Sequence, residues 1–149
     1  MTKADKIVDL DLKVSEGALQ RIRDGFEGNG CGSGAGSHFV CGTLQKLIGI
    51  DFSLVWTIHD SEYTESRTLK SNTKKTLADS NLYYNINTVM GLNDKEPQRL
   101  KRTFARWLYV ALIMGGHNAY WDITSKYPSP LTIVAWLAVI YTISGGFNG

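Results

Sequence analysis

Hydrophobic and polar residues alternate in three stretches of the N-terminal part of the chain, namely 6–14, 50–59 and 81–90. In the second stretch, five large apolar side chains occupy every second position from Ile50 to Ile58. Side chains at every second position of a β-strand point to the same face of the sheet. The alternation therefore predicts three strands with an apolar row along one face.

Two turns, each followed by a returning strand, complete the predicted hairpins. Residues 15–18 have the chemistry of a turn, and residues 19–23 are predicted to run back as a second strand, with a short helix beginning at Ser15 as the alternative. Residues 59–62 predict another turn, after which the Thr- and Tyr-rich stretch 63–70 suits a returning strand. These segments indicate an antiparallel sheet built of hairpins.

A glycine-rich stretch separates the predicted hairpins. Residues 25–36 contain six glycines, which predicts a long loop, and residues 38–48 fit either a short helix or an irregular strand. The glycine pattern matches neither a dinucleotide fingerprint nor a Walker loop, because no Lys-Ser/Thr pair follows it. No phosphate-bearing cofactor is therefore predicted.

The hydrophobic period changes to three and four residues near position 94. Apolar side chains then recur at helical spacing as far as Met114, and Gly115 with its following glycine is predicted to end that helix. A second helix is predicted to begin with Ser129 as its cap and Pro130 at its first position. The predicted fold class is α+β, with the sheet in about 6–90 and two C-terminal α-helices in about 94–146.

The composition is that of a folded globular chain with little net charge. A length of 149 residues is typical of one domain, so residues 1–149 are predicted to form a single domain. The chain is 43% hydrophobic and 20% charged, as in globular proteins, and its formal charge of +2 is small for a duplex DNA binder. Because residues 1–13 carry charges throughout, no targeting segment is predicted, and we expect synthesis in the cytosol.

The last predicted helix is apolar on every side, and no charged residue follows Ser129. Such a helix is either buried all round or lies in lipid. Its apolar core, residues 131–143, is shorter than the ~20 residues that span a bilayer, so burial against a second copy is favoured over a membrane-attached protein. The prediction is an obligate homodimer in which both C-terminal helices pack on the partner's sheet: Trp107, Met114, Trp136 and Ile140 against Phe52, Leu54 and Trp56.

Three groupings of reactive residues were weighed as possible catalytic or metal sites. Two cysteines are too few for a disulfide framework, and their pairing stays open. A zinc set of Cys31, His38, Cys41 and His59 has the spacing of no common zinc module, so no metal is predicted. A thiol hydrolase, the enzyme alternative, rests on chain order alone: Cys31 or Cys41 as nucleophile, His117 as base, and Asn118 or Asp122 to orient it. The protein is predicted not to be an enzyme.

The polar face of the predicted sheet suggests a partner. It carries aromatic, amide, hydroxyl and basic side chains, which can stack on bases, bond their edges and meet phosphates of single-stranded RNA. An ordinary solvent-exposed sheet face is the alternative. The predicted RNA-binding residues are Thr57, His59, Thr68, Lys70, Tyr83, Asn85 and Asn87.

Three short stretches resemble the coat proteins of single-stranded RNA bacteriophages. They are Tyr83-Tyr84-Asn85-Ile86-Asn87 on the last predicted strand, Leu92-Asn93-Asp94-Lys95-Glu96 at the first helix, and Tyr127-Pro128-Ser129-Pro130 before the second. The resemblance implies a self-assembling capsid protein whose dimers close into a shell around RNA, present in the virion and assembled in the host cytoplasm. The segments 25–36 and 115–128 depart from that family's pattern.

Overall fold

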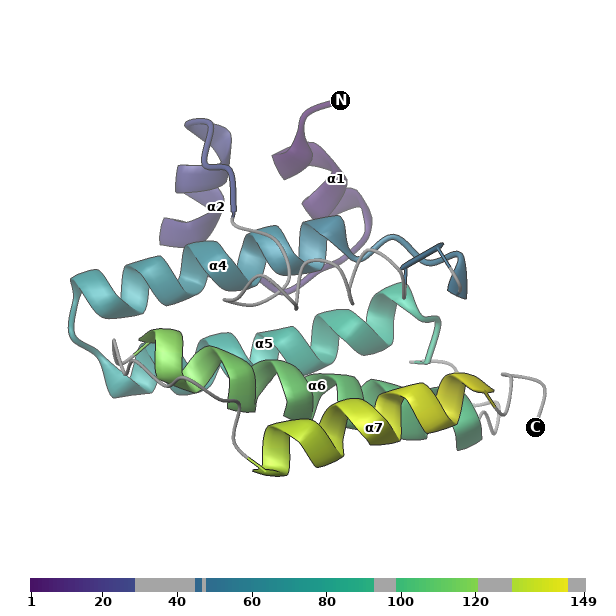
Figure 1. Cartoon of the computed structure of the whole chain (residues 1–149). Coiled ribbons are helices and arrows are strands. Elements are labelled where there is room, and N and C mark those ends of the chain that lie inside the picture. The colour runs from purple at the N-terminus through teal and green to yellow at the C-terminus, as the bar shows by residue number, and fades with distance from the viewer. Residues whose placement is uncertain (29–44, 47, 93–98, 121–129, 145–149) are drawn as a thin grey trace.

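The computed structural model describes residues 1–28, 45–46, 48–92, 99–120 and 130–144. Within them the chain forms six helices (Figure 1), which are α1 (Lys3–Asp9), α2 (Glu16–Arg23), α4 (Ser53–Thr68), α5 (Asn72–Val89), α6 (Arg99–Tyr120) and α7 (Pro130–Ser144). The same residues contain no strand. The predicted α+β fold is therefore wrong in its sheet, whereas the two C-terminal helices are confirmed.

Every segment predicted as a strand falls on a helix or beside one. The stretch 6–14 overlaps α1 and the turn and non-helical residues after it, and 19–23 lies in α2, so the short helix beginning at Ser15 was the correct alternative. The stretches 50–59 and 63–70 both fall mainly in α4, and 81–90 falls in α5. The helix predicted to stop at Gly115 continues instead to Tyr120.

The sheet prediction failed because the buried faces of α4 and α5 are partly polar. In α4 the buried side chains include His59, Glu62 and Glu65 beside apolar ones. In α5 the buried face alternates apolar and amide side chains at helical spacing: Ala78, Asn81, Leu82, Asn85 and Ile86. A period of 3.6 is visible only when these polar residues are counted as buried.

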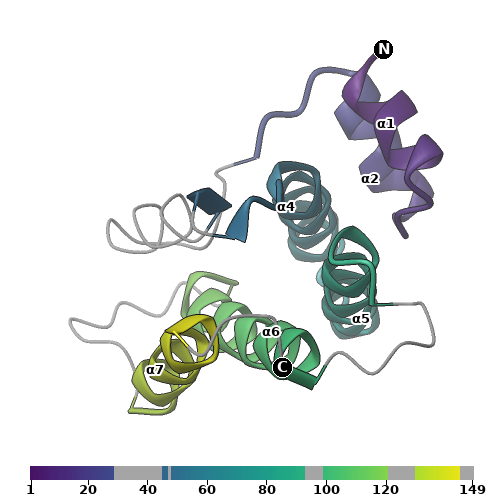
Figure 2. The same cartoon turned by 90° about the vertical axis from the view of Figure 1, so that its right-hand side faces the viewer.

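The helices form two antiparallel hairpins and an N-terminal pair. α4 pairs with α5 and α6 pairs with α7, while α5 packs on α6 and α2 packs on α4. Viewed end-on, α4, α5, α6 and α7 follow one another along an arc, with α1 and α2 beyond α4 (Figure 2). The N-terminal pair and α7 thus lie at opposite ends of the molecule.

Local side-chain bonds set where the helices begin. Thr2 and Asp5 form a reciprocal capping box on α1, and Ser15 caps α2 through its hydroxyl, which accepts from the Ala18 N–H. Lys70, at φ 49°, closes α4 in the left-handed region, and Ser71 caps α5 directly afterwards. Lys70 therefore occupies a helix–helix turn rather than a strand.

The main core lies between α4, α5, α6 and α7. Its fully buried side chains include Phe104, Leu108 and Val139, and Phe52 stacks on Trp56 with ring centroids 5.3 Å apart. Trp107 and Trp136 pack against this cluster from the C-terminal helices. Trp107 and Trp136, predicted to pack on a partner's Phe52 and Trp56, therefore pack on the core that contains these residues in the same chain. Ile140 is exposed, and Leu54 packs against the smaller core.

A second, smaller core joins the N-terminal pair to α4. It consists of the buried side chains Ala4, Ile7, Leu12, Ile22 and Ile58. No helix among the described residues combines the length and the hydropathy needed to cross a bilayer.

Candidate functional site

The outward face of α7 is apolar, like its inward face. The buried residues of the inward face are Thr132, Ala135, Val139 and Thr142, and Trp136 and Ile143 beside them pack against the main core. The outward face, called here the α7 face, consists of Ile133, Val134, Leu137, Ile140 and Tyr141, which are 46%, 51%, 59%, 54% and 77% exposed. A surface helix normally carries polar and charged residues on its outward face. This is the apolar surplus that the sequence predicted for the C-terminal region.

The α7 face is a continuous stripe. Ile133, Leu137 and Ile140 follow one another at steps of four and three residues, which keeps them on one side of the helix, and Val134 and Tyr141 flank them. Neither the stripe nor the rest of the sequence after Ser129 contains a charged side chain. Contiguous exposed apolar surface of this kind marks sites of interaction.

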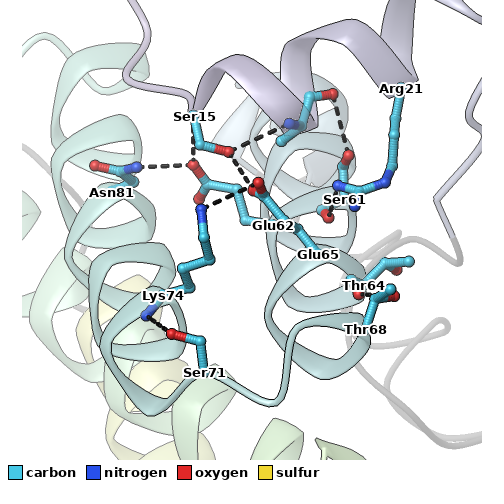
Figure 3. A network of polar contacts seen from close by, with 11 residues as sticks. Ser15, Arg21, Ser61, Glu62, Thr64, Glu65, Thr68, Ser71, Lys74 and Asn81 are labelled. Atoms are coloured by element: carbon cyan, nitrogen blue, oxygen red, sulfur yellow. Dashed lines mark hydrogen bonds and ion pairs between the residues drawn. The ribbon is translucent and has the colours of Figure 1, made fainter.

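A buried polar network, called here the polar seam, joins the N-terminal pair to α4 and α5. It consists of Ser15, Glu62, Glu65, Asn81 and Asn85. Figure 3 shows Glu62 and Glu65 of α4 turned toward Ser15, with Asn81 reaching in from α5. All these partners lie far from Ser15 in the sequence, so the seam is a tertiary contact.

Glu62 is the most deeply buried carboxyl of the seam, with 3% of the residue exposed. Its Oε1 accepts the Ser15 backbone N–H at 2.8 Å and the Asn81 side-chain N–H at 2.8 Å, whereas its Oε2 has no hydrogen-bond partner among the described residues. Burial raises the pKa of Glu62 to about 7, although both hydrogen bonds act against that rise. Two donors on one oxygen suit a protonated acid whose hydroxyl is the other oxygen.

Glu65 behaves in the opposite way. Its Oε2 accepts the Ser15 hydroxyl at 2.7 Å, and its Oε1 accepts Lys74 Nζ at 3.2 Å. Burial raises the pKa of Glu65, but these bonds outweigh burial and hold it below its ordinary value. Gly17 permits this approach, because a Cβ at that position would lie 2.4 Å from Glu65 Oε1.

Asn85 binds the backbone of the N-terminal segment. Its Oδ1 accepts the Lys13 N–H at 2.7 Å and its Nδ2 donates to the Lys13 carbonyl at 2.8 Å, and the residue is 0% exposed. Lys13 Nζ lies 4.0 Å from the centroid of the Tyr84 ring, in a cation–π contact. A cavity of about 10 Å³, the room that one water molecule needs, lies beside the seam between Ser15, Glu62 and Lys74.

A second polar cluster surrounds Asp79 of α5. His59 Nε2 lies 3.3 Å from Asp79 Oδ1, the Tyr63 hydroxyl donates to the same oxygen, and Lys75 Nζ donates to Oδ2 at 3.0 Å. Burial raises the pKa of Asp79, but these three bonds outweigh it, so the pKa lies below its ordinary value. Burial lowers the pKa of His59, whose ring also packs on Tyr63. The cluster neutralises a buried carboxylate between α4 and α5.

The chain matches no protein-family model, and neither a curated protein nor a solved structure is significantly similar to it. The resemblance to phage coat proteins therefore rests on the three short stretches alone. The first of them, Tyr83 to Asn87, lies in helix α5 rather than on a strand, and most of the other two lies outside the described residues.

The seven predicted RNA-binding residues do not share one face. Thr57, His59, Asn85 and Asn87 are buried, and Tyr83 is half-buried with its ring edge against Tyr109. Thr68 and Lys70 are exposed at the end of α4. These residues would share one face only in a sheet, and the helical fold separates them.

The other candidate sites are only partly within the described residues. Cys31, His38, Cys41 and Asp122 lie outside them, as do the side chains of His117 and Asn118. Among the residues that the structure does describe, no group of His, Cys, Asp and Glu could hold a metal ion.

Glu62, Glu65 and Asn81 of the seam were not among the residues predicted from the sequence, and Asn85 was predicted to bind RNA rather than the backbone of Lys13. Their signal was present as Glu62-x-x-Glu65 and Asn81-x-x-x-Asn85, because residues three and four apart share a helix face. That spacing carries information only once α4 and α5 are known to be helices.

Proposed function

We propose that this protein is a self-associating structural protein whose contact with a second copy is the α7 face. The observation that carries the proposal is the exposed side of α7, where five large apolar side chains face outward without a charged residue among them. Contiguous apolar surface on one helix is stabilised when another surface removes it from water.

A second copy fits this face for reasons of charge and area. A two-fold contact places the same patch on both partners, so a patch without charges brings no like charges together. The five side chains expose on the order of 500 Å² per chain, about two thirds of the ~800 Å² that each partner buries in a standard interface. Helices that lie on lipid usually carry Lys or Arg along their polar face, whereas α7 has none.

A closed shell around single-stranded RNA is the larger assembly that the coat-protein resemblance implies, and we retain it as a further prediction of the same proposal. In such a shell the protein has no catalytic role. Particles visible by electron microscopy that carry RNA would support this assembly.

Light scattering after size-exclusion chromatography tests the proposal. We expect the wild-type chain to form a dimer or larger assembly, and Leu137→Glu to weaken it at least about 100-fold, because a symmetric contact would bury two carboxylates in apolar surroundings. Leu69→Glu is the matched control, since Leu69 is similarly exposed, at 57%, but lies at the end of α4. It should leave assembly unchanged.

Two results would overturn the proposal. One is a monomeric wild-type chain at high concentration. The other is a chain that is monomeric in solution but sediments with phospholipid vesicles through Leu137, which would assign the α7 face to lipid.

A further inference from the structure

The N-terminal segment is held by recognition of its backbone as well as its side chains. Asn85 binds both the N–H and the carbonyl of Lys13, and Glu62 binds the N–H of Ser15. The Ser61 hydroxyl adds a bond at 3.1 Å to the Ala18 carbonyl. The α4–α5 hairpin thus contains a receptor site for an extended segment, which residues 13–15 occupy.

A long connection separates this segment from its receptor. Residues 24–52 lie between α2 and α4, and six of the residues from 25 to 36 are glycines. Phe52 is buried in the main core and Ile48 and Ile50 pack against it, so only the 21 residues 27–47 can extend, and they reach at most roughly 70 Å. That reach allows the N-terminal segment to be bound by α4 and α5 of its own chain or of a neighbouring one.

We propose that residues 1–26, called here the arm, are exchanged between two copies, so that each arm docks on the partner's α4–α5 hairpin. The inference rests on the proposed self-association and names a second contact within that assembly. Exchange conserves every bond of the polar seam and the small core around Ile7 and Ile58, so it costs little contact energy.

Charge at the seam regulates the docking in this scheme. The charged or titratable groups around Glu62 are Glu65 on its own helix, Lys74 and Asp79 on α5, and Arg21 on α2. Glu65 and Asp79 disfavour ionisation of Glu62, and Lys74 is bonded to Glu65. Arm docking is therefore weaker, and exchange faster, at a pH at which Glu62 is ionised.

Cross-linking between two full-length single-cysteine variants tests the exchange. In a Cys31→Ser, Cys41→Ser background, one chain carries Lys13→Cys and the other Tyr84→Cys, positions whose side chains are in contact in the structure. Neither chain can form the 13–84 link alone. The two are mixed, left to equilibrate, treated with a short bismaleimide and analysed by mass spectrometry, with light scattering on the same mixture.

We expect a covalent 13–84 heterodimer in up to about half of the dimers, since random mixing pairs unlike chains in that proportion. A single chain carrying both substitutions should cross-link internally or across the dimer in any case, which verifies the geometry. A mixture of Lys13→Cys with Val8→Cys, whose Val8 is exposed on the arm itself, measures collisional cross-linking.

The outcomes separate the two proposals. Dimers by light scattering with 13–84 heterodimer no more abundant than the collisional control would overturn arm exchange and leave the α7 contact standing. The absence of dimers would overturn both.

Discussion

At the scale of single residues, Glu62 has the chemistry that most distinguishes this molecule. Its carboxyl accepts two hydrogen bonds on one oxygen while the other faces no donor among the described residues. Because its pKa in the folded chain, about 7, lies above the ordinary value of 4.5, folding takes up a proton between these values. Glu62 therefore contributes most favourably below pH 4.5, and this contribution is lost as the pH rises to about 7.

Replacing Glu62 by Gln is expected to stabilise the protein at pH 8 and to have little effect near pH 4.5. The amide mimics the protonated acid and avoids the cost of a buried charge, which at about 1.4 kcal/mol per pKa unit amounts to at most about 3 kcal/mol. Urea unfolding at several pH values measures the free energy of unfolding of both chains.

The quantity to compare in that experiment is the difference between the two chains at each pH. His59 contributes with the opposite sign, because burial lowers its pKa and makes it a source of stability above pH 6.5 that fades as the pH falls. A variant that is less stable than the wild type at pH 8 would show that Glu62 serves the fold as a carboxylate.

At the scale of elements, α4 and α5 differ from α6 and α7 in what they bury. The C-terminal helices could be predicted because their core positions are apolar at steps of three and four, as in Phe104, Leu108 and Ala111. In α4 and α5, the buried Glu62 and Asn81 interrupt the apolar pattern, and accidental alternation in 50–59 then favoured a strand. The pattern of hydrophobicity cannot show which polar groups find buried partners.

The same division applies to the candidate sites. The apolar surplus after Ser129 was visible in the sequence, since it depends on residue types alone. The polar seam was not, because Lys13 and Asn85 are joined only by the tertiary fold. The predicted RNA-binding residues share no face in the structure for a related reason. Residues share a face at every second position in a strand but at every third or fourth position in a helix.

Asn85→Ala is expected to destabilise the protein by about 2–3 kcal/mol, because it leaves the Lys13 N–H and carbonyl without their partner. Asn87→Ala is the control on the same helix. Its side chain bonds the Tyr83 carbonyl one turn earlier, so the expected loss is under about 1 kcal/mol. If chemical denaturation showed the same loss of unfolding free energy for both variants, the contact of Asn85 with Lys13 would contribute no more than a local helix contact.

At the scale of the whole molecule, two surfaces proposed for contacts between chains lie at opposite ends. The arm packs beyond α4 and the α7 face lies beyond α6, with the core of the two hairpins between them (Figure 2). One contact is a polar network with backbone recognition, and the other is a charge-free apolar stripe. The two contacts should therefore respond differently to solvent conditions.

The oligomer is expected to persist in 1 M NaCl, because an apolar contact without charges is not weakened by screening. Any RNA that copurifies should be released under the same condition, since its binding depends on phosphate contacts. Light scattering and the absorbance ratio at 260 and 280 nm, recorded at low and high salt, measure both effects. Dissociation of the oligomer by salt would assign the assembly to charged groups instead.

The way Asn85 holds position 13 has a consequence for how this chain can vary. Both bonds go to backbone atoms, so Asn85 itself does not read the side chain of Lys13, which contacts the Tyr84 ring instead. Any amino acid that supplies an N–H can form the bonds to Asn85, which excludes proline alone. A saturation library should therefore be permissive at position 13 and restrictive at position 85, an asymmetry between two residues that touch each other.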